Sequence, residues 1–185
     1  MSYRDAMRFL TAILLLAFAT AFSACARPLP VFGDVPDFSL TDQEGRTVTK
    51  KDLAGSVWVA DFIYTGCATA CPALTQRMAE LKPVARLVSF SVDPEVDTVE
   101  RLKAYSERFG ADPASWSFLT GPVEDVRKTI SEGFKLSAQK VDADVFHSEK
   151  FVLVDAQGRI RGYFDADPKG IEALRRAVKQ CKESS

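Results

Sequence analysis

A continuous apolar run, Val57 to Tyr64, is the feature of this sequence that most restricts its fold. Asp61 is the one charged residue within it, and Gly66 follows it. A strand that is apolar at nearly every position, instead of at every second one, is typical of a strand covered on both faces. The sequence therefore predicts a central strand in a partly parallel sheet with a layer on each side.

Helical and strand patterns alternate after this run, and a hairpin precedes it. Helices are expected at 72–81, 97–109, 123–134 and 171–182, and strands at 38–40, 47–49, 86–92, 116–120, 151–154 and 160–164. Trp58, Phe62 and Phe151 are expected in the core because they follow strand period. A βαβ unit followed by a hairpin and a closing helix is the order of a thioredoxin-like α/β fold. We therefore predict a three-layer sandwich with an N-terminal β-hairpin.

Composition excludes one class of function and draws attention to a few residues. The 185 residues include 24 Lys and Arg against 25 Asp and Glu, a net charge of −1, so there is no basic surface to attract nucleic acid. The length suits one domain with a real core. One histidine and four cysteines leave few side chains for metal binding or nucleophilic chemistry.

Residues 1–26 differ from the rest and read as a targeting segment. Arg4 and Arg8 precede an apolar run, 9–24, that ends in small residues before Cys25. Three interpretations stay open: a lipoprotein signal with lipid attached to Cys25, ordinary cleavage after the A-x-A-like Ala24-Cys25-Ala26, or an uncleaved membrane anchor. Each interpretation places the remaining chain in the cell envelope, facing the periplasm or the exterior. In the lipoprotein and the uncleaved-anchor interpretations, the membrane is a partner.

Residues 27–36 read as an extended linker because three prolines among them oppose a helix. The folded domain is expected to occupy residues 37–185. This division gives a targeting segment, a linker and one domain.

Two cysteines follow the central strand directly. In Cys67-Ala68-Thr69-Ala70-Cys71-Pro72, the proline suits the first helical position, which predicts Cys71 as the N-cap. The positive end of the helix would then lower the pKa of one or both thiols. Three intervening residues allow the two sulfurs to share a metal ion or, after some adjustment, to form a disulfide. A purely stabilising disulfide is the simpler alternative.

The single histidine, His147, lies just before the strand expected at 151–154. Loops at the ends of strands in an α/β sheet can meet, so His147 can join Cys67 and Cys71. Two thiolates and one imidazole suit Cu(I), whereas Zn(II) would want a fourth ligand. The alternative is an ordinary packed or exposed loop histidine.

Four segments occur in this order along the chain: F-I-Y-T-G-C-A-T-A-C-P, S-V-D-P-E-V-D-T with L-K-A-Y-S-E-R-F, L-T-G, and H-S-E-K-F-V-L-V-D-A-Q-G. Together they resemble the Sco/SenC family of thioredoxin-fold copper-binding proteins. The resemblance implies membrane-tethered proteins that help metallate the binuclear copper centre of cytochrome c oxidase. It also implies that Cys67, Cys71 and His147 are the copper ligands.

The chain departs from the family pattern around these residues. The family usually has Pro and Asp between the cysteines, where this chain has 68–70 as Ala-Thr-Ala. The family usually has Tyr-x-Val-Asp before the histidine, where residues 143–146 of this chain read Ala-Asp-Val-Phe. It also usually has an Arg at the position of Val96. Because residues around ligands tune a metal site, these changes bear on copper affinity, redox poise and the docking surface.

Two functions of different class remain. The first is a metallochaperone that transfers copper, most readily as Cu(I), to a copper-accepting protein such as a cytochrome c oxidase subunit or another envelope cuproprotein. The second is a thiol-disulfide oxidoreductase with Cys67 and Cys71 as its redox-active pair, and the two can coincide in one protein. A peroxiredoxin-like peroxidase is disfavoured because Thr65 and Cys67 lack the required Thr-x-x-Cys spacing. His147 separates the first two, since a pure reductase does not need it.

Three further residues have simpler interpretations. Asp93 either orients the site or forms a turn before Pro94, and Asp97 is interpreted as a helix N-cap. Cys181 has no partner in the pattern, which leaves an exposed thiol or a pairing between molecules, and it is assigned no function.

Overall fold

The structure, a computed structural model, describes residues 28–184 apart from 68–69, 135–138, 142–143 and 147–148. The main sheet has the strand order β1-β10-β9-β4-β5-β6. Its strands are β1 (Gly33–Asp34), β4 (Trp58–Ile63), β5 (Arg86–Ser91), β6 (Trp116–Leu119), β9 (Lys150–Val154) and β10 (Arg159–Asp165). Strands β4, β5 and β6 are parallel, whereas β9 is antiparallel to β4 and β10 is antiparallel to β9. The apolar run thus forms β4, a central strand of a partly parallel sheet, as predicted.

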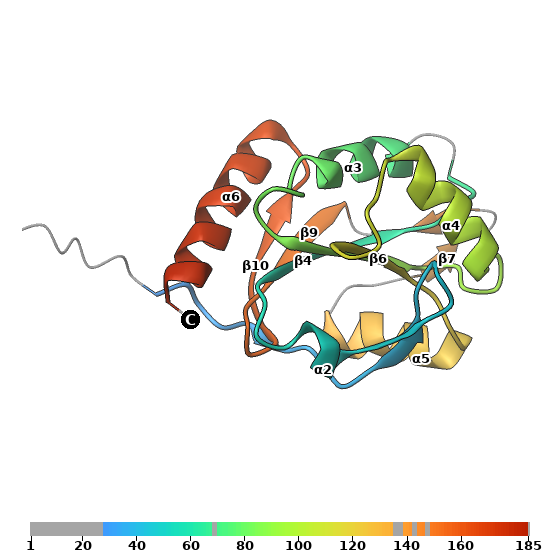
Figure 1. The fold of residues 1–185 in the computed structure, drawn as a ribbon, viewed down its shortest axis with the longest axis horizontal. Coiled ribbons are helices and arrows are strands. Elements are labelled where there is room, and N and C mark those ends of the chain that lie inside the picture. Colours follow the sequence, from blue (N-terminus) through green and yellow to red (C-terminus); the bar gives the residue numbers. More distant parts are fainter. Residues whose placement is uncertain (1–27, 68–69, 135–138, 142–143, 147–148, 185) are drawn as a thin grey trace, which may run out of the picture.

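Helices cover both faces of this sheet (Figure 1). On one face lie α3 (Ala70–Ala79), α4 (Val99–Arg108) and α6 (Pro168–Glu183), and on the other α2 (Lys50–Leu53) and α5 (Val123–Lys128). The hairpin of β2 (Ser39–Thr41) and β3 (Thr47–Thr49) packs with the second group. The predicted three-layer sandwich with an N-terminal hairpin is confirmed.

Side chains of β4 alternate between two separate cores. Val59 and Ile63 belong to the core under α3, α4 and α6, whereas Trp58 and Phe62 belong to the core over α5. Every residue of β4 is buried, which is why the strand is apolar at nearly every position. Phe151, the third predicted core aromatic, is also fully buried.

Several elements differ from the sequence-based prediction. Part of the predicted linker joins the sheet as β1, where Gly33 pairs with Ile160 of β10. The helix expected at 123–134 is α5 followed by a π-helical turn, η1 (Thr129–Gly133). A second small hairpin, β7 (Gln139–Val141) with β8 (Asp144–Phe146), was not predicted, since its strands are only three residues long.

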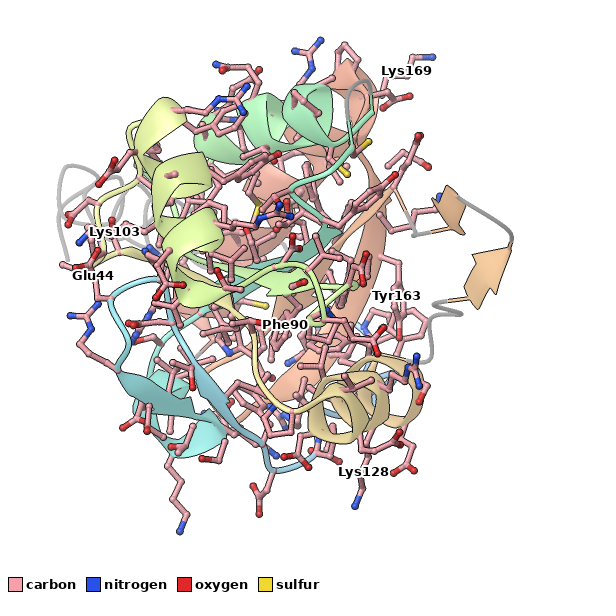
Figure 2. The ribbon with its side chains drawn as sticks, turned by 90° about the vertical axis from the view of Figure 1, so that its right-hand side faces the viewer. Glu44, Phe90, Lys103, Lys128, Tyr163 and Lys169 are labelled. Carbon is pink, nitrogen blue, oxygen red and sulfur yellow. The ribbon has the colours of Figure 1, made fainter. Side chains whose placement is uncertain are left out.

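Side chains connect the two helical layers at the edge of the sheet and join neighbouring strands in the interior (Figure 2). Lys103 of α4 contacts Glu44 in the β2–β3 turn at 3.1 Å. Phe90 of β5 lies in the interior, stacked on Phe62 with ring centroids 5.9 Å apart. Within the described residues, no helix combines the length and apolar character needed to cross a bilayer.

Candidate metal and thiol site

Cys67 and Cys71 lie where β4 passes into α3, at the carboxyl end of the central strand. The chain leaves the sheet through a turn in which the backbone N–H of Cys67 donates to the carbonyl oxygen of Tyr64 at 3.3 Å. Helix α3 begins at Ala70, so Cys71 lies in its first turn. The prediction that Cys71 caps the helix and Pro72 begins it was wrong, because the helix starts one residue before Cys71.

No disulfide joins Cys67 to Cys71 in this structure, and a hydrogen bond from the helix backbone connects them. The backbone N–H of Cys71 donates to the Sγ of Cys67 at 3.2 Å. The first N–H groups of a helix have no partner within the helix, so this contact satisfies one of them. It also places the Cys67 sulfur at the positive end of α3, where a negative charge on sulfur is stabilised.

Burial distinguishes the two thiols. Cys71 is fully buried, whereas Cys67 is half-buried. Burial raises the pKa of the Cys71 thiol, and the nearby Cys67 and Asp61 raise it further, against a smaller lowering by its hydrogen bond with the Tyr64 backbone. A lowered pKa was predicted for one or both thiols, and Cys71 is not such a thiol, because its loss of solvation outweighs the effect of the helix end.

A buried carboxyl group lies on β4 beneath this site. Asp61 is completely buried, and neither of its carboxyl oxygens has a hydrogen-bond partner among the described residues. Burial raises its pKa to about 7, and the nearby hydroxyl of Ser89 offsets only part of that rise. Asp61 was not among the predicted site residues, although a lone charged residue in an otherwise apolar strand was a visible signal.

Asp97 is a second buried acid that the sequence analysis misread. Helix α4 begins at Val99 and is capped by Thr98, whose side chain accepts from the N–H of Arg101 at 3.3 Å. The Asp97 carboxylate instead accepts hydrogen bonds from Thr65 and from Ser91. The interpretation of Asp97 as a helix cap was therefore wrong, since its side chain turns away from the helix toward the loop that carries Cys67.

Three candidates remain: His147, Asp93 and Cys181. His147 lies outside them, while the start of β9 at Lys150 follows shortly after it. Asp93 forms a turn, its carbonyl oxygen accepting from the N–H groups of Val96 and Asp97. Cys181 is buried in α6 among core residues, so the alternative of an exposed thiol was wrong. In the described part of the chain, no group of three His, Cys, Asp or Glu side chains is placed to hold a metal ion.

These features define a class of protein: a thioredoxin-like fold that carries a pair of thiols where the central strand meets the following helix. The model of the SCO1/SenC family matches residues 33–182. The chain belongs to the SCO1/SenC family, which confirms the resemblance seen in the sequence.

Individual relatives support the same assignment. The SCO1 protein homolog of Bacillus subtilis (strain 168) is 33% identical over 161 residues, covering 82% of this chain and 83% of its own. A SCO1/SenC family lipoprotein from Bacillus anthracis str. Ames has a TM-score of 0.76 at 35% identity, covering 81% of this chain and 95% of that one. ScoI of Bradyrhizobium japonicum, solved with copper bound, has a TM-score of 0.64 at 29% identity, covering 80% and 99%.

Proposed function

We propose that this protein is a metallochaperone that carries one copper ion as cargo, held as Cu(I) by Cys67, Cys71 and His147. Its acceptor would be the binuclear copper centre of cytochrome c oxidase or another cuproprotein of the cell envelope. The observation that carries the proposal is the contact between the N–H of Cys71 and the Sγ of Cys67 at 3.2 Å. It holds the first sulfur against the helix turn that carries the second.

The chemistry of the pair fits this cargo. Cu(I) prefers soft sulfur ligands and tolerates low coordination numbers. The half-buried Cys67 leaves its sulfur accessible to an incoming ion, while Cys71 is anchored in the helix. Since the pKa of the Cys71 thiol is raised, copper binding must displace its proton, so copper affinity should rise with pH.

Membership of the SCO1/SenC family and the copper bound to Bradyrhizobium japonicum ScoI support copper over other cargoes. The N-terminal segment supports a location in the cell envelope, tethered to the membrane through residues 1–26, which lie outside the described residues.

The test is copper stoichiometry of the purified full chain in detergent after anaerobic loading with Cu(I). We expect one copper per chain, lost in Cys67→Ser and in Cys71→Ser. Cys181→Ser is the matched control because Cys181 is also a buried thiol but lies in α6, away from the pair. Full copper retention by both site variants would contradict the assignment, as would equal loss in the control.

A second function is favoured by the unequal burial of the thiols. In a thiol-disulfide oxidoreductase, the accessible Cys67 thiolate would attack a client disulfide and release one client thiolate. Cys71, after losing its proton, would then attack Cys67 Sγ and release the second. The client gains two electrons and the Cys67–Cys71 pair becomes a disulfide. This reaction uses the same two residues without His147.

A further inference from the structure

The carboxylate of Asp97 joins two loops that follow neighbouring parallel strands. Its Oδ1 accepts from the backbone N–H of Thr65 at 3.0 Å and from the Thr65 hydroxyl at 2.6 Å. Its Oδ2 accepts from the hydroxyl of Ser91 at 2.7 Å and more weakly from the Thr65 N–H at 3.3 Å. Thr65 follows β4 and Ser91 ends β5, so one side chain fixes both strand ends.

Asp97 is held rigidly in this position by its own loop. The N–H groups of Val96 and Asp97 donate to the carbonyl oxygen of Asp93 at 3.0 and 2.9 Å, and the N–H of Asp93 donates to Ser91 Oγ at 3.1 Å. Asp97 itself is completely buried. A buried carboxylate is costly unless it is hydrogen-bonded, so the loop of Thr65 must keep its donors in place.

Thr65 lies inside the turn that presents Cys67. The turn runs from Tyr64 to Cys67 and is closed by the hydrogen bond from the Cys67 N–H to the Tyr64 carbonyl oxygen at 3.3 Å. Immediately before it, the N–H of Val92 donates to the carbonyl oxygen of Ile63 at 2.8 Å, which ties the two loops together at the sheet. Fixing Thr65 therefore fixes the direction in which Cys67 leaves the sheet.

We propose that Asp97 is a positioning residue for the thiol pair: by holding Thr65, it sets where the Cys67 sulfur lies relative to the first turn of α3. Two measurable properties follow from that placement. One is the affinity for Cu(I), and this half rests on the proposed function. The other is the equilibrium between the dithiol and the disulfide, which can be measured without copper.

The test compares Asp97→Asn with Thr98→Ala. The amide of Asn cannot accept all three donors, because its NH₂ group is itself a donor. Thr98→Ala is the matched control, since it removes the cap of α4 at the next residue without touching the bonds to Thr65. We measure the dithiol–disulfide equilibrium in glutathione buffers and the Cu(I) affinity by chelator competition, both on the full chain.

For Asp97→Asn we expect Cu(I) affinity to fall by about ten- to a hundred-fold, the range for residues that orient metal ligands. We expect the dithiol–disulfide equilibrium to move toward the disulfide, because the bonds at Thr65 stabilise the loop in its dithiol form. Thr98→Ala should give wild-type values for both, even where it lowers the stability of the fold.

A milder pair of variants keeps the test informative if Asp97→Asn does not fold. Thr65→Val removes the hydroxyl donor but keeps the branched side chain and the backbone N–H, and Thr65→Ser restores the hydroxyl. We expect Thr65→Val to shift the thiol equilibrium in the same direction as Asp97→Asn, and Thr65→Ser to return it to the wild-type value.

The results separate the two proposals. A wild-type chain that binds no copper would overturn the proposed function, while a shifted thiol equilibrium in Asp97→Asn would still support the role of Asp97. Wild-type equilibrium and wild-type affinity in Asp97→Asn or in Thr65→Val, or equal shifts in Thr98→Ala, would overturn the role of Asp97.

Discussion

The hydroxyl groups of Thr75 and Tyr105 lie 2.8 Å apart in the buried core and join α3 to α4. Thr75 belongs to the helix that carries Cys71, one turn further along, and both side chains are buried. Burial raises the pKa of the Tyr105 phenol, so this group stays protonated and able to donate. The contact fixes the helix of the thiol site against its neighbour.

Tyr105→Phe should therefore destabilise the protein by about 1–3 kcal/mol, because it leaves the Thr75 hydroxyl buried without its partner. Thr75→Val should cost a similar amount, and the double variant less than the sum of the two. Urea unfolding of the four proteins provides the measurement. Strict additivity would show that the two hydroxyls contribute independently.

The burial of Asp61 should make the free energy of unfolding depend on pH in an unusual direction. Its pKa is raised by burial from 3.8 to about 7 in the folded protein, so between these values the folded state binds more protons at this residue than the unfolded state. The contribution of Asp61 to stability is then full below pH ~4 and is lost as pH rises to ~7, a change on the order of 4 kcal/mol. Asp61→Asn should remove this loss.

The measurement is the free energy of unfolding at several pH values between 4 and 8 for both proteins. Glu172→Gln is the control, because Glu172 is an exposed carboxylate on α6. The prediction fails if wild type and Asp61→Asn change in parallel over this range.

His147→Ala distinguishes the two candidate functions. If copper transfer is the role, the variant should hold Cu(I) more weakly, because two ligands remain of three, and cells carrying it should lose oxidase activity. Its thiol-disulfide chemistry should survive, since Cys67 and Cys71 are unchanged. Chelator competition on the purified variant and oxidase activity in cells are the paired measurements. Wild-type values for both would favour the oxidoreductase.

Cys25→Ser tests how the N-terminal segment is used. If Cys25 carries a lipid, the wild-type chain should partition with membranes and the variant should lose the lipid and fail to be processed. Membrane fractionation with mass spectrometry of the mature N-terminus gives the answer. A wild-type protein recovered without lipid and beginning at Arg27 would instead indicate ordinary cleavage.

Much of the fold could be predicted because its signals are local. The apolar run at 57–64 indicated a strand buried on both faces, and β4 is that strand. Helical period located α3, α4 and α6 to within a few residues. The short β7–β8 hairpin and the π-helical turn after α5 were missed, since strands of three residues and a widened helical turn have no distinct period.

The chain by itself determined its sheet, its family and the pair of thiols at the end of the central strand. These depend on spacing along the sequence: a run that is apolar at nearly every position, and two cysteines with three residues between them before a proline. Tertiary structure decided what surrounds that pair. Burial of the Cys71 thiol, which the residues next to it in the sequence do not reveal, raises its pKa even though Cys71 lies in the first turn of α3. Asp97 accepts hydrogen bonds from Thr65, which lies 32 residues away in the sequence. Parallel pairing of β4 and β5 brings the ends of these strands together, so only the folded sheet creates that contact.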